Sequence, residues 1–101
     1  MDEQRRVAAF VATHDMETAP AYRLLDLSSE LGELAKEICA STDYGSRPAD
    51  VAVSEDEVGD ALFALLALAE ELDVDAGAAL ETSLAKYERR IEETGDAGSG
   101  Q

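Results

Sequence analysis

Residues 24–38 read LLDLSSELGELAKEI and carry the clearest helical pattern in the chain. The large apolar side chains of this stretch recur every three or four residues, which is the spacing of one face of an α-helix. The stripe consists of Leu24, Leu27, Leu31, Leu34 and Ile38. Pro20 suits a first helical turn, so the sequence predicts a helix from Pro20 to about Ala40.

Three more helices are predicted on either side of this one. They are expected at residues 3–14, from Ser54 to about Leu72, and from about residue 76 to Glu93. Ser54 and Glu57 have the spacing of a capping box at the start of the third helix. Residues 41–53 contain the Gly, Pro, Ser and Asp residues that are typical of a loop. The predicted fold is therefore all-α, with one domain over residues 1–94 and a flexible C-terminal tail over residues 95–101.

The third predicted helix also indicates how the chain assembles. No residue from Ala61 to Ala69 is polar, so every face of that stretch is apolar. Such a helix is normally buried on all sides, and three short neighbours from one chain would struggle to cover it. A second copy packed through a two-fold interface is the simplest remedy. We therefore expect a four-helix bundle whose core is completed by homo-oligomerisation, as a homodimer or a dimer of dimers.

The chain is strongly acidic. Its 101 residues carry 23 acids against 8 bases, which gives a net charge of −15. This charge repels nucleic-acid backbones and anionic membranes, so neither is expected as a partner. Acids occur in every segment and the only lysines are Lys36 and Lys86, so we favour adaptation to high salt as the cause of most of the charge. Only the positions of particular acids can then indicate function.

Cysteine content and hydropathy bear on the location of the protein. Cys39 is the only cysteine, which excludes an intrachain disulfide and a cysteine-based zinc site. The residues near Met1 are charged and do not form a signal peptide. The apolar run of the third helix is too short to span a bilayer. A soluble, cytoplasmic protein is expected.

Particular acids line up on two consecutive predicted helices. One stripe precedes the leucine stripe by one residue and therefore borders the buried face: Asp26, Glu30, Glu33 and Glu37. Glu57 and Asp60 have the same spacing at the start of the third helix. Neighbouring like charges are unfavourable, and partial burial makes them more costly, so a divalent cation is the natural compensation.

The kind of cation follows from the ligands available. All-oxygen ligands favour Mg²⁺ or Mn²⁺ over Zn²⁺. His14 is the only histidine, which argues against the Glu-x-x-His motifs of a di-iron bundle. Two simpler interpretations stay open at this point. Glu57 could serve only as the acid of the capping box, and the acids of the second helix could form a solvated face.

Taken together, Glu30-Leu31-Gly32-Glu33 and Glu57-Val58-Gly59-Asp60 resemble the Glu-x-x-Glu and Glu-x-x-Asp signature of MazG-like pyrophosphohydrolases. The surrounding sequence is similar to that family as well, and the likeness covers roughly residues 20–92. Ser29 is a departure, because many members carry an additional Glu at this position. The four main acidic positions are intact.

The resemblance implies an enzyme that hydrolyses a nucleoside triphosphate, or a related nucleotide, to the monophosphate and pyrophosphate. It implies that one or more Mg²⁺ ions are held by four carboxylates: Glu30, Glu33, Glu57 and Asp60. These ions would bridge the triphosphate to an otherwise repulsive chain. A carboxylate that metal does not fully occupy could orient the attacking water as general base, and Glu33 or Glu37 is the candidate.

Lys86 and Arg90 resemble basic residues of the family's last helix, and their spacing places them on one helical face. They are candidates for binding the substrate phosphates, with the guanidinium able to contact two oxygens. A basic last turn that complements the helix dipole, or ion pairs with Glu88 and Glu92, would also explain them. The residues that contact the base stay open among the candidates Phe10, Tyr22, Tyr44 and Phe63.

Two other functions stay open. Phosphoribosyl-ATP pyrophosphohydrolase shares the helical scaffold and the acidic motif of the family that this chain resembles. A non-catalytic helical dimerisation module with an acidic, salt-adapted surface is of a different class. The module predicts no magnesium dependence, and it predicts that Glu30→Gln or Asp60→Asn is harmless or mildly stabilising.

Overall fold

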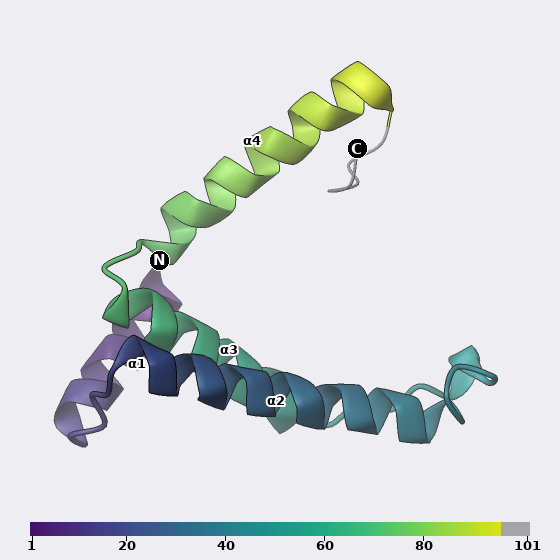
Figure 1. The fold of residues 1–101 in the computed structure, drawn as a ribbon, viewed down its shortest axis with the longest axis horizontal. Helices are drawn as coiled ribbons and strands as arrows, with labels where there is room; N and C mark the ends of the chain where they lie inside the picture. The colour runs from purple at the N-terminus through teal and green to yellow at the C-terminus, as the bar shows by residue number, and fades with distance from the viewer. Residues whose placement is uncertain (96–101) are drawn as a thin grey trace.

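The computed structural model describes residues 1–95, which form four α-helices and one turn of 3-10 helix (Figure 1). The elements are α1 (Asp2–Thr13), α2 (Pro20–Ser41), η1 (Pro48–Asp50), α3 (Glu55–Glu71) and α4 (Ala76–Thr94). The four α-helices lie within one residue of the bounds expected from the sequence, and residues 1–95 contain no strand. The all-α prediction is confirmed. The predicted flexible tail, apart from Gly95, lies outside the described residues.

The helix ends are fixed by local chemistry. Pro20 occupies the first turn of α2, as its sequence position indicated. The side chain of Asp75 accepts a hydrogen bond from the Ala78 N–H at 3.1 Å and so caps the start of α4. Gly95 ends α4 with a φ of 75°, in the left-handed region that glycine adopts without a steric penalty. Each of these ends is set by residues within one turn of the helix.

The predicted capping box at the start of α3 is wrong. Ser54 is the N-cap residue, but its side chain makes no capping hydrogen bond. Its hydroxyl lies 3.3 and 3.4 Å from the two carboxylate oxygens of Glu37, and its N–H donates to Glu37 Oε1 at 3.2 Å. The Glu57 N–H bonds to the Ser54 carbonyl instead, at 3.2 Å. The Glu57 carboxylate therefore has no capping role.

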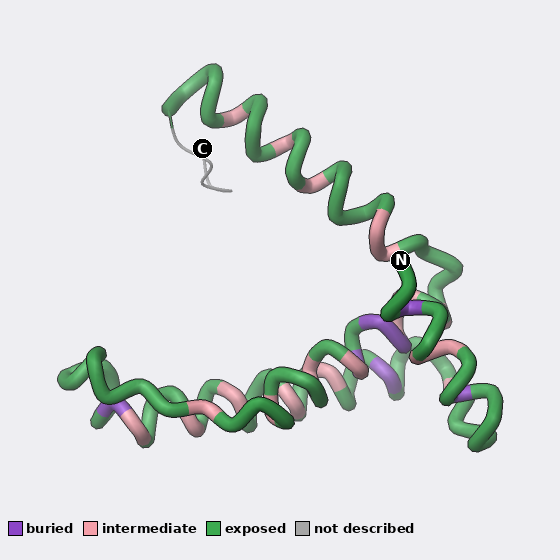
Figure 2. The backbone as a smooth tube through the Cα atoms, turned by 180° about the vertical axis from the view of Figure 1, so that it is seen from behind, coloured by how far each residue is buried: buried purple, intermediate pink, exposed green. Residues whose placement is uncertain are grey.

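The core lies where α1 and α2 pack against α3. The helices α2 and α3 run antiparallel, and α1 packs across the second half of α3 (Figure 1). The buried apolar residues gather near the crossing of α1 and α3 (Figure 2). They are Val11, Ala64, Leu66 and Ala67. This is a small core for a chain of 101 residues, because Leu62 and Leu65 of the apolar run remain 46% and 49% exposed.

Two buried polar side chains complete this core. Gln4 Nε2 donates to Glu70 Oε1 at 3.0 Å and to the Val74 carbonyl at 2.8 Å, and Gln4 Oε1 accepts from the Ala76 N–H at 2.7 Å. Arg23 donates to the Met16 carbonyl at 2.7 Å, and its guanidinium also lies 3.5 Å from Asp26 and 4.0 Å from Glu71. Gln4 thus fixes the corner between α3 and α4, and Arg23 fixes the connection before α2.

The helix α4 projects from this core instead of closing a bundle within the chain (Figure 1). The Cα radius of gyration is 16.5 Å, whereas a compact domain of this length has a radius of about 13 Å. None of the helices in the described part combines the length and the apolar character needed to cross a membrane. One chain therefore forms a three-helix core with a helical arm.

Candidate metal centre

Three carboxylates from two helices meet beside the α2–α3 interface. One oxygen each from Glu30, Glu57 and Asp60 lie within 4.8 Å of one another. Glu30 comes from the middle of α2, and the other two come from the first half of α3. Because α2 and α3 run antiparallel and pack against each other, the two acidic motifs are brought side by side. We call these three residues the carboxylate cluster.

Glu57 has the most perturbed environment of the cluster. Its Oε2 atom is buried and has no hydrogen-bond partner among the described residues. Burial raises the pKa of Glu57 above its ordinary value, and the neighbouring charges of Glu37, Asp56, Asp60 and Glu33 raise this pKa further. An unpaired buried carboxylate oxygen is costly, so the site favours a positively charged ligand.

Glu33 and Glu37 lie around the cluster and not within it. Each is close enough to Glu57 to raise the pKa of that carboxyl by charge repulsion. Glu37 also accepts the hydrogen bonds from Ser54, which tie the end of α2 to the start of α3. Asp26, the first acid of the predicted stripe, pairs with Arg23 at 3.5 Å and takes no part in the cluster.

The cluster has the ligand chemistry of a hard divalent cation. All three donors are carboxylate oxygens, which suit Mg²⁺ or Mn²⁺ better than Zn²⁺. None of the ion pairs among the described residues involves Glu30, Glu57 or Asp60, so no base of the same chain neutralises them. The unpartnered oxygen of Glu57 is an acceptor that a cation would satisfy. The residues present therefore fit a Mg²⁺ ion.

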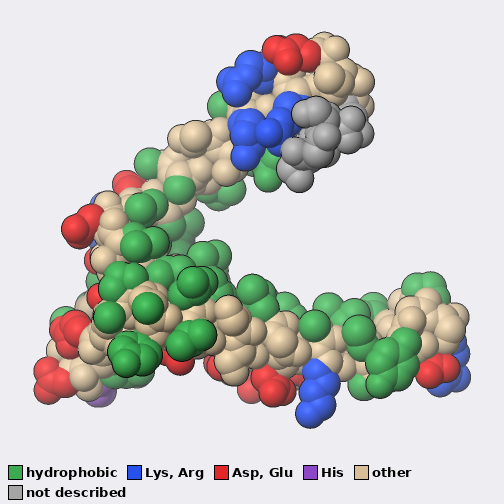
Figure 3. All heavy atoms as spheres, viewed as in Figure 1, with side chains coloured by type: hydrophobic (Ala, Val, Ile, Leu, Met, Phe, Trp, Pro, Cys, Tyr) green, Lys and Arg blue, Asp and Glu red, His purple; other side chains and the backbone are tan. Residues whose placement is uncertain are grey.

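The predicted phosphate-binding bases lie on the arm. Lys86 and Arg90 flank the ring of Tyr87 on α4, with their charged groups 5.0 and 6.0 Å from the ring centroid. Basic side chains gather on the outer half of α4 (Figure 3). Because α4 projects from the core, it carries these bases away from the carboxylate cluster of the same chain (Figure 1). A single chain therefore does not bring the two groups together.

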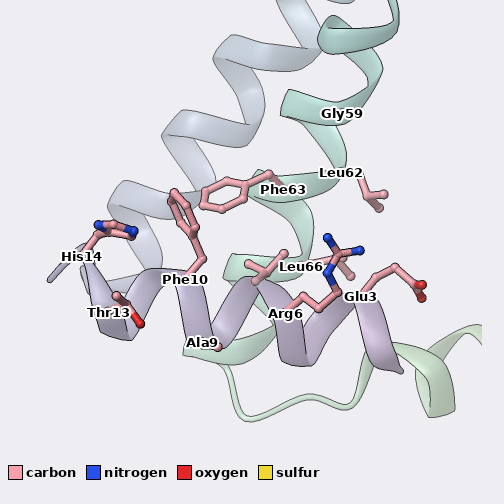
Figure 4. A pocket seen from close by; sticks show the side chains of 11 residues that line it. Glu3, Arg6, Ala9, Phe10, Thr13, His14, Gly59, Leu62, Phe63 and Leu66 are labelled. Carbon is pink, nitrogen blue, oxygen red and sulfur yellow. The ribbon is translucent and has the colours of Figure 1, made fainter.

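An apolar groove lies between α1 and α3. It has a volume of about 660 Å³, and the rings of Phe10 and Phe63 meet edge to face in it at 6.1 Å (Figure 4). His14 lies 4.4 Å from the Phe10 ring. The α3 residues that line the groove, such as Gly59 and Leu66, occupy a different face of the helix from Glu57. The groove is thus separate from the carboxylate cluster.

The other two aromatic candidates for base contact lie outside the groove. Tyr22 and Tyr44 are 65% and 84% exposed on the surface of one chain. Neither of them lines the groove that holds Phe10 and Phe63. The four aromatic side chains therefore do not converge on one slot beside the carboxylates.

The sequence patterns missed Ser54, Gln4 and Arg23 as residues that position the site. Their partners lie far along the chain, as in the bonds between Ser54 and Glu37 or between Gln4 and Ala76. A buried Gln or Arg has no periodic signature, because it satisfies backbone groups and not a repeating apolar face. No local signal could have found them.

Three comparisons with known proteins agree with this architecture. The MazG nucleotide pyrophosphohydrolase domain family matches residues 19–94. The uncharacterized protein YpjD of Bacillus subtilis is 36% identical over 76 residues, which cover 71% of this chain and 67% of YpjD. The crystal structure of YpjD, described as a candidate pyrophosphatase, matches with a TM-score of 0.70 at 32% identity and covers 85% of this chain and 88% of that chain.

The helical scaffold and its cluster of carboxylates define an all-α protein with a group of oxygen ligands that suits a divalent cation. The family match spans both acidic motifs as well as α4. The chain belongs to the MazG nucleotide pyrophosphohydrolase family.

Proposed function

We propose that this protein is a Mg²⁺-dependent pyrophosphohydrolase that cleaves a nucleoside triphosphate to the monophosphate and pyrophosphate. One observation carries the proposal: oxygens of Glu30, Glu57 and Asp60 lie within 4.8 Å of one another, and a buried oxygen of Glu57 has no partner among the described residues. Membership of the MazG family supports the same reaction class.

Glu30, Glu57 and Asp60 would hold the cation, with Glu33 as a further ligand from α2. A bound Mg²⁺ would offset the charge of the polyphosphate and stabilise the charge that develops on its phosphoryl oxygens. Without such a cation, a chain with a net charge of −15 would repel its own substrate. The carboxylates would thus select a phosphorylated ligand only together with its metal.

The chain must also orient a water molecule and accept its proton. Water attacks the phosphorus atom of the α- or β-phosphoryl group, the bond between these two groups breaks, and a proton passes to a carboxylate. Glu33 and Glu37 are the candidates for this general base. Glu37 already accepts hydrogen bonds from Ser54, so the proposal favours Glu33 for proton transfer. Because one chain does not bring Lys86 and Arg90 to its own cluster, these bases would bind the phosphates that leave as pyrophosphate only within the expected homo-oligomer.

The test is pyrophosphate release from canonical and damaged nucleoside triphosphates, with Mg²⁺ and with a chelator. The assay should contain a high concentration of KCl, because the repulsion between acids on so acidic a surface is expected to need screening by salt. Phosphoribosyl-ATP belongs in the same panel, since its preferential cleavage would replace the proposed substrate class. Magnesium-dependent release from at least one nucleoside triphosphate is expected.

Matched variants make the test specific to the cluster. Glu57→Gln should lower kcat/KM at least about a hundredfold, because charge stabilisation by a catalytic cation contributes several kcal/mol. Glu55→Gln removes the same charge from the same helical turn outside the cluster and should retain most of the activity. Full activity in Glu57→Gln and Asp60→Asn would favour the non-catalytic dimerisation module instead.

A further inference from the structure

The loop that follows α2 contains three consecutive residues in the left-handed backbone region. Asp43, Tyr44 and Gly45 have φ angles of 50°, 56° and 88°. Glycine adopts this region without a steric penalty and aspartate tolerates it, but a bulky aromatic residue there is an outlier. Strained residues of this kind persist only where the surrounding structure enforces them, and they are concentrated at functional sites. The backbone of Tyr44 therefore marks this loop as a candidate binding element.

Hydrogen bonds within the loop hold Tyr44 in the strained conformation. The hydroxyl of the buried residue Thr42 donates to the Ile38 carbonyl at 2.7 Å and accepts from the Gly45 N–H at 3.0 Å. The Tyr44 N–H donates to the Cys39 carbonyl at 2.7 Å. The turn is thus anchored to the last turn of α2, and the ring of Tyr44 is attached to a fixed backbone.

The strain does not serve to bury the ring of Tyr44. This side chain is 84% exposed. Within residues 1–95, no aromatic ring packs against it and no cation lies over it. Burial of an aromatic ring would offset an unfavourable backbone by removing apolar surface from water, and Tyr44 has no such compensation in the folded chain. A ligand that covers the ring would supply this compensation.

The loop lies at the end of the α2–α3 pair that is far from α1 (Figure 1). Glu37, one turn before the end of α2, accepts the Ser54 N–H at 3.2 Å and so ties the far end of the loop to the same helix. Cys39, which anchors Tyr44, lies about 14 Å from Glu30 of the carboxylate cluster along the axis of α2. The sugar and phosphates of a nucleoside triphosphate form a chain that can span this distance.

Charge decides which part of a nucleotide this loop can contact. Asp43, Asp50 and Glu55 are exposed acids of the loop and of its junction with α3. The one base of the loop, Arg47, pairs with Asp50 at 3.4 Å. Such a surface repels phosphates that carry no metal ion, whereas a nucleobase is uncharged and its flat face stacks on aromatic side chains. The exposed ring of Tyr44 therefore suits the base and not the phosphates.

We propose that Tyr44 stacks on the base of the nucleotide while the phosphates and their Mg²⁺ lie at the carboxylate cluster. This inference rests on the proposed function and makes Tyr44 a substrate-binding residue. Because every nucleobase has a π-face, stacking contributes affinity without selecting one base. Tyr44 thus strengthens the binding of nucleoside triphosphates in general and has no effect on tripolyphosphate.

Steady-state pyrophosphate release from Tyr44 variants tests the proposal. Tyr44→Asn removes a contact that is equal in the ground state and the transition state, so KM should rise while kcat is unchanged. Loss of one stacked base corresponds to binding that is about 5- to 150-fold weaker, and the rise should be shared by substrates with different bases. Tyr44→Phe keeps the ring and should keep the wild-type KM. An unchanged KM in Tyr44→Asn, or an equal loss in Tyr44→Phe, overturns the proposal.

The backbone strain gives a readout that a structural role of Tyr44 would move in the opposite direction. Asparagine adopts the left-handed region more readily than tyrosine, so Tyr44→Asn should melt a few degrees above wild type while it binds nucleotide more weakly. Tyr22→Asn makes the same change at an exposed tyrosine on the other end of α2, and it should raise neither KM nor the melting temperature. A melting temperature of Tyr44→Asn below wild type overturns the proposal.

Light scattering on the same variants tests another use of the exposed ring. An exposed aromatic side chain can also anchor a contact between protein copies. Tyr44→Asn should leave the mass of the wild-type assembly unchanged, because the ring contacts substrate and not protein. A lower mass for Tyr44→Asn overturns the proposal.

A binding measurement without hydrolysis separates failure of this inference from failure of the proposed function. The chain has no tryptophan, so Tyr44→Trp places a single indole on the loop. With Mg²⁺, a non-hydrolysable nucleoside triphosphate analogue should quench the indole fluorescence by stacking, and tripolyphosphate, which has no base, should not. Tyr22→Trp is the matched control and should not respond to either ligand.

The two assays together assign each outcome. Quenching of Tyr44→Trp by the nucleotide analogue alone supports the stacking contact, even if the wild-type protein releases no pyrophosphate and the proposed function fails. No quenching in a protein that does release pyrophosphate overturns the stacking contact and leaves the proposed function standing. Equal quenching by tripolyphosphate also overturns the stacking contact.

Discussion

The buried amide of Gln4 ties α1 to the corner from which α4 departs. Its three hydrogen bonds reach Glu70, Val74 and Ala76 at 3.0, 2.8 and 2.7 Å. Gln4→Leu keeps most of the side-chain volume and removes all three bonds. At a net value of about 1 kcal/mol for each bond, the substitution should lower the free energy of unfolding by about 3 kcal/mol. The total free energy of unfolding of a domain is only about 5–15 kcal/mol, so this loss is large.

Urea unfolding followed by circular dichroism measures this loss as a lower midpoint at an unchanged slope. Arg5→Ala is the matched control, because Arg5 is the next residue on α1 and its side chain forms an exposed ion pair with Asp2 at 3.2 Å. Such a pair contributes about 0–1 kcal/mol. If Gln4→Leu loses no more stability than this control, the amide does not fix the corner. A loosened corner should also lower pyrophosphate release, because α4 no longer leaves at a fixed angle.

Three further predictions follow from the cluster and the charge of the chain. Burial, and to a smaller extent the neighbouring acids, raise the pKa of Glu57 above 4.5 in the folded protein. Protonated Glu57 therefore favours the folded state at a pH below the unfolded pKa, and this contribution to stability is lost as the pH rises through the raised pKa. Metal-free Glu57→Gln should therefore melt above wild type at pH 7 and equal it below pH 4.5, and equal melting at pH 7 would contradict this. Ser54→Ala should weaken Mg²⁺ binding several-fold in calorimetry by freeing the start of α3, whereas Ser46→Ala, whose bonds are local to the loop, should not. Raising KCl from about 0.1 to 1 M shortens the Debye length from about 10 to 3 Å, so the melting temperature should rise, and a fall would argue against adaptation to salt.

Local patterns predicted the helices well because each helix carries its own periodic face. The apolar side chains of this face recur at helical spacing whatever they pack against: Leu24, Leu27, Leu31, Leu34 and Ile38. The pairing of the two acidic motifs could also be predicted, since consecutive helices joined by a loop tend to lie side by side. The proximity of Glu30, Glu57 and Asp60 follows from these two facts.

What the sequence could not predict depends on competition between distant groups. The Ser-x-x-Glu pattern is typical of a capping box, but the Ser54 hydroxyl donates instead to Glu37, which lies 17 residues earlier in the chain. The direction of α4 likewise depends on Gln4, which reaches residues 66 and 72 positions away. An apolar stripe predicts that one face of a helix is buried against another helix, but it does not predict whether that other helix belongs to the same chain.

The separation of acids from bases has a physical rationale of its own. If Lys86 and Arg90 lay beside Glu57 in the same chain, they would form ion pairs with the cluster and offset its charge before any ligand arrived. In the described residues those acids have no ion-pair partner, so the free chain bears a repulsion that binding relieves. A ligand that binds only the folded state stabilises it in proportion to the logarithm of its concentration. A cation bound to the carboxylate cluster would thus contribute both stability and the charge balance that the proposed hydrolysis requires.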